Sequence, residues 1–495
     1  MTDTFRRALL ALLLIGLAAG PDAGAQALQK RIDTRLGAAP LNRNLWGIVL
    51  MGTNGKTLYG KNADRMFIPA SNTKLVVSAV AAALLPPDWT VQTSLYSDGP
   101  VEAGVLRGDL VLYGRGDPTM GSRCYAVDTT SAGSCDTDPF EKMRALAGGL
   151  RARGITTVTG DLVGDGSWFQ GELVNGDWET YDLNWWYAAP VSGLGFNDNS
   201  IDFAYAPGPE VGAPAVIAFT PDFGSVQFEN RTRTVPAGQP TTIDFYRTPG
   251  TMHVWAEGDV AIDSRGRKEY FALPDPDLFA AQALRSVLAD SGIAVLGSTG
   301  STTDSMRYLA ARQGPELAAV TSRPVKEWIF PILNTSQNWY AEMLLKQLGR
   351  QFGEGGSWKG GLAVERRFLI DSMGVDSTQF ALRDGSGLSS SNLVSPNTFA
   401  MLLAFMHRHP NFASFAAGLP QSGQRGSLKS RFVGTPLEGL VHAKTGSISR
   451  VNTLSGYIER PGQVLVFSVE ANNHTLGSRV MIPAIDSLVV QMGRK

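Results

Sequence analysis

A short polar segment stands at the head of an apolar run at residues 67–85, which reads FIPASNTKLVVSAVAAALL. Ser71 and Lys74 are three positions apart, so their side chains lie on one face of a helix. Beyond Leu75 the run is apolar except for Ser78, which predicts a helix buried nearly all round. A buried lysine loses its proton readily, and a neutral amine beside a hydroxyl is a base beside a nucleophile. A plainer interpretation stays open, in which Ser71 caps the helix and Lys74 is solvated.

A serine nucleophile needs a base. The sequence shows none of the residue spacings typical of a histidine base or a metal site. No Gly-x-Ser-x-Gly elbow occurs in the chain. The histidines show neither a triad spacing nor a metal-binding spacing, and the two cysteines do not make a zinc site. We therefore expect no metal and no cofactor, and lysine is left as the base.

A Lys-Thr-Gly tripeptide occurs once, in the predicted strand HAKTGSI at residues 442–448. The cation of Lys444 can hold a substrate carboxylate. Gly446 lets a substrate backbone lie close to the strand, and the amide of Ser447 can point at an oxyanion. Taken alone, the tripeptide is equally well an ordinary edge-strand lysine before a turn.

The pattern Ser-x-Asn supplies a hydroxyl that relays a proton and a carboxamide that holds the lysine and the substrate. It occurs three times, at residues 336–338, 390–392 and 395–397. The last two lie in a loop rich in Gly, Ser and Pro. The first opens the predicted helix NWYAEMLLKQLG, which would fix its geometry, so we select Ser336 and Asn338.

Both ends of the chain supply the elements that must position these residues. Predicted strands lie at 45–51 and 56–60, around an Asn-Gly turn, and at 439–447, 452–459 and 463–471 near the other end. These strands and their flanking helices predict an α+β domain with an antiparallel sheet, built from residues 26–96 and 302–495. The Gly- and Pro-rich middle predicts mostly-β insertions: a first inserted domain at 97–170 and 256–301, and a second, nested one at 171–255.

The first 25 residues have the pattern of a signal peptide. Arg6 and Arg7 precede an apolar stretch at 8–19, and Ala23-Gly24-Ala25 offers small residues at a cleavage site. No later stretch is apolar enough for a membrane span. We expect an exported protein, periplasmic or otherwise extracytoplasmic, with no integral membrane segment after signal removal. In that oxidising compartment Cys124 and Cys135 are expected to form a disulfide.

The charges nearly cancel, with 44 Lys and Arg against 45 Asp and Glu, so no nucleic-acid partner is expected.

Taken together, Ser-x-x-Lys, Ser-x-Asn and Lys-Thr-Gly in this order resemble the signature of penicillin-binding proteins and serine β-lactamases. Ser71 and Ser336 are 265 positions apart, which is similar to the class C low-molecular-mass penicillin-binding proteins, the D-alanyl-D-alanine carboxypeptidase/endopeptidase family. The stretches GVLRGDLVLYGRGDPTM, RDGSGLS and LPQSGQRGSL are also similar to this family. One departure is Gln337, where Asp or Asn is commoner.

The resemblance implies a penicillin-binding/β-lactamase-like transpeptidase fold and a serine DD-peptidase that works through an acyl-enzyme. It implies that Ser71 attacks the bond between two D-alanines, Lys74 takes its proton, and Ser336 relays a proton to the departing D-alanine. Asn338 would position the substrate and Lys74.

The resemblance further implies that Lys444 and Thr445 hold the terminal carboxylate, while the amides of Ser71 and Ser447 form the oxyanion hole. The implied partners are peptidoglycan stem peptides and β-lactam antibiotics, with endopeptidase action on D-Ala–diaminopimelate cross-links as a further activity.

Two alternative functions stay open. A serine β-lactamase would need a deacylating Glu or Tyr, which the spacing does not assign. A non-catalytic penicillin- or peptidoglycan-binding protein would have no need of a Ser-Lys pair.

Overall fold

The computed structural model describes residues 23–121, 138–224, 226–248 and 250–494. Cys124 and Cys135 lie outside the described residues, and so does the predicted signal peptide up to residue 22. The first described element is helix α2, Ala23–Gly37. Among the residues described, no helix combines the length and the apolar character needed to cross a membrane.

The two ends of the chain build one antiparallel sheet, in the order β2-β1-β22-β21-β20. Its strands are β2 Thr57–Lys61, β1 Leu45–Gly52, β22 Gln463–Asn472, β21 Val451–Arg460 and β20 Val441–Ile448. β1 and β2 are joined through Gly55, whose φ of 86° suits the predicted Asn-Gly turn. The predicted strands are thus confirmed, within one or two residues at their ends. β20, which carries the Lys-Thr-Gly tripeptide, is an edge strand.

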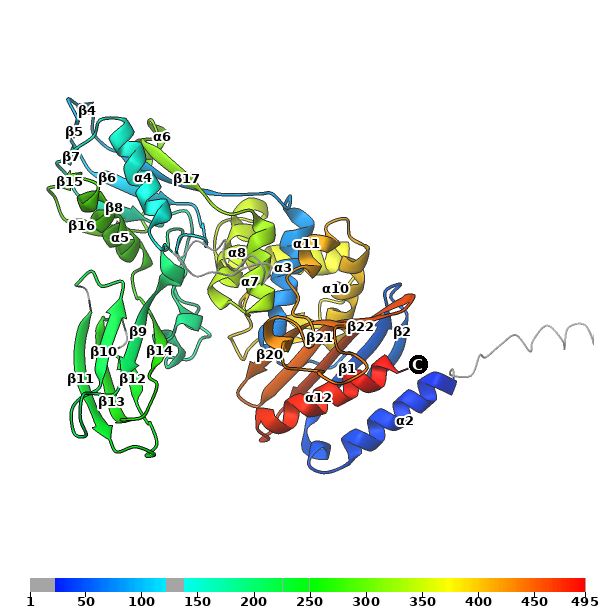
Figure 1. Ribbon diagram of the computed structural model, residues 1–495. Helices are drawn as coiled ribbons and strands as arrows, with labels where there is room; N and C mark the ends of the chain where they lie inside the picture. The colour runs from blue at the N-terminus through cyan, green and yellow to red at the C-terminus, as the bar shows by residue number, and fades with distance from the viewer. Residues whose placement is uncertain (1–22, 122–137, 225, 249, 495) are drawn as a thin grey trace, which may run out of the picture.

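Helices cover both faces of this sheet. α2 lies beside α12, Ser478–Gly493, on one face, and a larger group of helices lies on the other (Figure 1). That group consists of α3 Lys74–Leu84, α7 Val325–Asn334, α8 Asn338–Phe352, α9 Trp358–Arg367, α10 Pro396–Arg408 and α11 Phe412–Ala416. Because both faces are covered, β1 and β22 are buried along most of their length.

α3 sits at the centre of the helical layer, against α7, α8, α10 and α11. Its residues from Lys74 to Ala82 are all buried, as the apolar run predicts.

The middle of the chain forms further sheets on the far side of α7 and α8 (Figure 1). One sheet has the order β16-β8-β6-β3-β17, with β16 Thr299–Thr302, β8 Leu162–Asp165, β6 Leu110–Gly114, β3 Gln92–Ser97 and β17 Ala318–Thr321. A smaller sheet of two-residue strands joins β15 Ala294–Val295, β7 Thr157–Val158, β5 Val105–Leu106 and β4 Val101–Glu102. Helices α4 Glu141–Ala152, α5 Pro276–Asp290 and α6 Leu309–Gln313 accompany them.

Two three-stranded sheets follow, built from strands between residues 200 and 272. They are β10-β9-β14, with β10 Val216–Thr220, β9 Ser200–Ala206 and β14 Arg267–Ala272, and β11-β13-β12, with β11 Gln227–Val235, β13 His253–Ala261 and β12 Asp244–Arg247. A short pair, β18 Phe380–Ala381 and β19 Leu393–Val394, lies in the predicted α+β domain. β17 pairs with β3 although it lies beyond residue 302, so the domain boundaries given above stay a prediction.

Candidate active site

The segment that carries Ser71 is a tight turn in front of a helix. Ala70–Thr73 form a 3-10 helix that runs directly into α3, which begins at Lys74. Ala70 has a φ of 47°, a left-handed conformation that turns the chain before the helix starts. The Ser71 side chain caps no helix; its Oγ lies 3.0 Å from Lys74 Nζ.

Strand β21 holds this turn against the sheet. Thr453 Oγ1 donates to the carbonyl of Pro69 at 2.9 Å. Asn72 Nδ2 donates to Ser455 Oγ at 2.7 Å. The residues on both sides of Ser71 are therefore fixed by side chains of a buried strand, which positions the hydroxyl before any substrate arrives.

Lys74 is fully buried and has three oxygen partners. Its Nζ lies 2.6 Å from Asn338 Oδ1 and 2.6 Å from the carbonyl of Ser386, besides the contact with Ser71. Burial lowers the pKa of Lys74 to about 7, and the carboxylates of Asp384 and Glu342 oppose that shift. The Asn338 and Ser386 oxygens can only accept. A neutral amine that donates its two hydrogens to them keeps its lone pair for the Ser71 hydroxyl.

The Ser-x-Asn motif has the same construction as the Ser-x-x-Lys motif. Ser336 has a φ of 64° and precedes the helix, and α8 begins at Asn338. The predicted start of this helix at Asn338 is thus confirmed. Asn338 places its Oδ1 on Lys74 and donates from Nδ2 to the carbonyl of Tyr187 at 2.7 Å.

Gln337, the departure from the commoner motif, has two partners of its own. Its Oε1 accepts from the amide of Trp339 at 3.0 Å and caps α8. Its Nε2 donates to Asp198 Oδ2 at 2.8 Å. Asp198 belongs to the inserted region, so the longer side chain of Gln337 ties the motif to the insertion.

Strand β20 brings Lys444 to the same place. Its Nζ donates to Ser336 Oγ at 2.9 Å and to the carbonyl of Thr445 at 2.7 Å. Burial and the nearby Lys74 lower the pKa of Lys444 well below its usual range. The hydroxyl of Thr445 lies at the surface, where it donates to Ser427 Oγ at 2.9 Å.

Gly446 packs against the turn that carries Ser71. A Cβ built on Gly446 would lie 2.7 Å from the carbonyl of Pro69 and 3.1 Å from the amide nitrogen of Ser71. Ser447 follows directly and is exposed, so the two amides predicted to form the oxyanion hole lie on adjoining segments.

We expect Gly446→Ala to lower the catalytic rate by about 100-fold. The methyl group would lie 2.1 Å from Thr453 Oγ1, the hydroxyl that holds the carbonyl of Pro69, so it must displace Thr453, β20 or the Ser71 turn. Steady-state kinetics of the purified variant measures this. Gly300→Ala is the control, since nothing lies within 4 Å of a Cβ at that strand glycine. Equal activity of the two variants would contradict the close approach described here.

The structure therefore brings the predicted residues together in two neighbouring sets of contacts. Lys74 contacts Ser71 and Asn338. Lys444 contacts Ser336, and Lys74 is near enough to lower the pKa of Lys444. Thr445 and Ser447 lie on the strand beside them. The other two Ser-x-Asn copies have structural roles: Ser395 caps α10, and Asn392 bonds the amide of Arg383 and the carboxylate of Asp384.

Three contributors were missed as site residues in the sequence. The carbonyls of Ser386 and Tyr187 and the hydroxyl of Ser427 touch the predicted residues. Ser386 and Ser427 lie in RDGSGLS and LPQSGQRGSL, which were noted only through a family resemblance. Every residue type carries a backbone carbonyl, so nothing in the sequence identifies Tyr187 as a contributor to the site.

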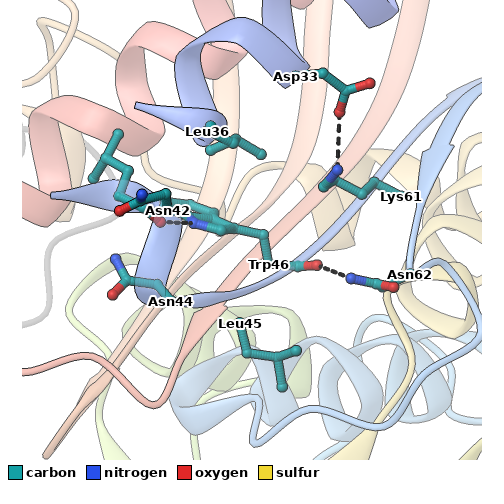
Figure 2. A pocket seen from close by; sticks show the side chains of 10 residues that line it. Asp33, Leu36, Asn42, Asn44, Leu45, Trp46, Lys61 and Asn62 are labelled. Carbon is teal, nitrogen blue, oxygen red and sulfur yellow. Dashed lines mark hydrogen bonds and ion pairs between the residues drawn. The ribbon is translucent and has the colours of Figure 1, made fainter. Parts of the chain in front are cut away.

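A separate hollow of about 340 Å³ lies between α2 and the β1–β2 edge of the sheet (Figure 2). Asp33 and Lys61 form an ion pair at 2.8 Å on its wall, and Trp46 Nε1 donates to the carbonyl of Leu41. None of the motif residues lines it. The motifs lie at the opposite edge of the sheet, at β20.

Comparisons with known proteins identify the family of this chain. The family model "D-Ala-D-Ala carboxypeptidase 3 (S13)" matches residues 28–492. A D-alanyl-D-alanine carboxypeptidase of Actinomadura sp. (strain R39) is 31% identical over 462 residues, which cover 90% of this chain and 81% of that protein. The D-alanyl-D-alanine carboxypeptidase DacB of Haemophilus influenzae is 24% identical over 451 residues, covering 87% of this chain and 86% of that protein.

Among solved structures, penicillin binding protein 4 of Haemophilus influenzae superposes with a TM-score of 0.77 at 22% identity. The match covers 94% of this chain and 97% of that chain. This likeness confirms the predicted fold class, an α+β architecture of the penicillin-binding type.

Proposed function

The chain belongs to the D-Ala-D-Ala carboxypeptidase 3 (S13) family of serine DD-peptidases, and from this premise we propose how its own residues perform the reaction. Ser71 is the nucleophile and Lys74 the base. The observation that carries this assignment is the neutral-amine geometry, in which Lys74 Nζ lies 3.0 Å from Ser71 Oγ and is held by two oxygens that can only accept.

In the proposed acylation, Lys74 takes the Ser71 proton as Oγ attacks the carbonyl between the two D-alanines. The amides of Ser71 and Ser447 stabilise the oxyanion, a contribution of about 3–4 kcal/mol for each donor in acyl-transfer enzymes. Ser336 passes the proton that Lys74 has taken from Ser71 to the nitrogen of the leaving D-alanine, and its contact with Lys444 orients that hydroxyl. Water then hydrolyses the ester on Ser71.

The terminal carboxylate of the substrate is proposed to bind at the surface hydroxyls of Thr445 and Ser427. Lys444 precedes Thr445 on β20, and its Nζ contacts the Thr445 carbonyl. Its pKa is low in the free protein because it is buried beside Lys74, and an incoming carboxylate favours its protonated form. Lys444 is therefore proposed to become protonated when the substrate carboxylate binds.

The proposed substrates are the stem peptides of peptidoglycan, with D-Ala–diaminopimelate cross-links as a second target, and β-lactams are proposed to acylate Ser71. Export to the periplasm or another extracytoplasmic compartment, through cleavage near Ala25, and a Cys124–Cys135 disulfide stay part of the proposal.

The function is tested by incubating the protein without its first 25 residues with two substrates. One is a peptide ending in D-Ala-D-Ala, and the other is a cross-linked D-Ala–diaminopimelate dimer. Release of free D-alanine from the first establishes carboxypeptidase action, and cleavage of the dimer establishes endopeptidase action. If neither substrate is cleaved by folded protein, the proposed function is wrong.

The pH dependence of acylation follows from the pKa of Lys74. Only the neutral amine accepts the Ser71 proton, so the rate constant should rise with pH and reach half its maximum near pH 7. Below that value it should fall about tenfold for each pH unit. Stopped-flow acylation by a chromogenic cephalosporin between pH 5 and 9 measures the profile. A rate that stays level down to pH 5 would contradict the role of Lys74 as base.

A further inference from the structure

Three buried carboxyl groups lie behind the base, and the proposed reaction uses none of them. Glu342 on α8, Glu365 on α9 and Asp384 in the loop after β18 are all 0% exposed. Buried carboxyl groups are costly unless they are hydrogen-bonded, so the partners of each group indicate what it does.

Glu342 and Asp384 both bind the backbone of one loop, residues 384–389. Glu342 Oε1 accepts from the amide of Ser386 at 2.7 Å, and its Oε2 accepts from the amide of Gly385 at 3.0 Å. Asp384 accepts from the amides of Gly387 and Ser389 at 2.8 and 2.7 Å. Two carboxyl groups thus hold four backbone amides of this loop, those of Gly385, Ser386, Gly387 and Ser389.

This loop touches both members of the Ser-Lys pair. The carbonyl of Ser386 accepts from Lys74 Nζ at 2.6 Å. Gly387 has a φ of 78°, and a Cβ there would lie 1.8 Å from the carbonyl of Ala70, the residue before Ser71. Because the packing is this close, a displacement of the loop moves an acceptor of the base and presses on the nucleophile turn.

We propose that Glu342 is a positioning residue: by binding the amides of Gly385 and Ser386 it fixes the Ser386 carbonyl, which directs the Lys74 amine at Ser71. The inference rests on the proposed function, in which Lys74 is the base. It adds a residue that contacts neither the substrate nor Ser71, and that acts through a backbone carbonyl.

Glu342 holds the loop through its two carboxyl oxygens, both of which accept hydrogen bonds. A third donor, Trp358 Nε1, lies 2.8 Å from Glu342 Oε2, so every contact described for Glu342 comes from an N–H group. Glu342→Gln leaves one acceptor and turns an NH₂ group toward these donors, which the loop can avoid only by moving.

Glu365 supplies a matched control. It is as deeply buried as Glu342, but neither of its oxygens has a hydrogen-bond partner among the residues described. Burial and the carboxyl groups of Glu342 and Asp384 raise the pKa of Glu365 well above its usual range. Glu365→Gln therefore changes a buried carboxyl group to an amide of the same shape without touching a loop amide.

The test measures penicillin acylation at pH 8.5, separating the noncovalent dissociation constant from the acylation rate constant. We expect Glu342→Gln to lower the rate constant about 100-fold, as a misplaced reacting group does, with the dissociation constant changed by less than about twofold because the carboxylate site on β20 is untouched. Glu365→Gln should acylate like the wild type. Thermal unfolding of all three proteins accompanies the kinetics.

The inference is overturned if Glu342→Gln acylates as fast as Glu365→Gln, or if both constants change in proportion to a loss of folded protein. Should Glu342→Gln fail to fold, Trp358→Phe removes one donor only. We then expect a several-fold slower acylation at an unchanged dissociation constant, and an unchanged rate constant overturns the inference. If the wild type itself is not acylated, the proposed function fails and this inference falls with it.

Discussion

Replacing Ser71 with alanine is expected to lower peptide turnover by about 10⁴-fold or more, because no acyl-enzyme can form without the nucleophile. Ser71 Oγ lies 3.0 Å from Nζ of Lys74, the proposed base, and the amide of Ser71 is one of the two proposed oxyanion donors. The measurement is D-alanine release from a peptide ending in D-Ala-D-Ala.

Ser78→Ala is the matched control for this loss. Ser78 lies on the same helix, is fully buried, and its hydroxyl has no hydrogen-bond partner among the described residues. It should retain near wild-type turnover. If Ser71→Ala turns over peptide at a rate close to that of Ser78→Ala, a different residue is the nucleophile.

Replacing Lys74 with methionine is the second large effect. Methionine fills the buried site without an amine, so Ser71 loses its base while the packing of α3 is nearly kept. A general base contributes about 10²- to 10⁴-fold, and we expect a loss at the upper end because Lys74 also organises Asn338. The acylation rate constant with a chromogenic cephalosporin measures it.

Lys346→Met is the control that distinguishes the loss of the base from the loss of a buried lysine in general. Lys346 is also buried, its pKa is also lowered to about 7 by burial, and its amine donates to the carbonyls of Glu172 and Val191. No serine of the motifs touches it. Folded Lys346→Met should be acylated at a rate within a few-fold of the wild type. A rate loss equal to that of Lys74→Met would show that removing any buried lysine lowers the rate, and that the loss in Lys74→Met does not identify Lys74 as the base.

Much of the site could be predicted because its chemistry depends on residue types at short spacing. Ser71 and Lys74 lie within one helical turn, and Lys444 lies in a tripeptide found once. The strands at both ends carry alternating or continuous apolar patterns. The fold class follows from their arrangement, since helices must cover both faces of a sheet this apolar.

What could not be predicted involves backbone atoms and backbone conformation. The left-handed conformations of Ala70 and Ser336 could not be predicted, because neither alanine nor serine favours that conformation. The role of Gln337 depends on Asp198, far away in the sequence. The Ser386 and Tyr187 carbonyls have no side-chain signal, so only the folded chain reveals them.

The central claim is that this DD-peptidase works through an acyl-enzyme on Ser71, and mapping the penicillin adduct tests it most directly. The wild-type protein is incubated with benzylpenicillin, its intact mass is followed over an hour, and the product is digested with trypsin. We predict one penicilloyl group for each chain, stable over that hour and located on the peptide of residues 66–74, which contains Ser71. An adduct on another peptide, or rapid hydrolysis of the drug without an adduct, would contradict the claim.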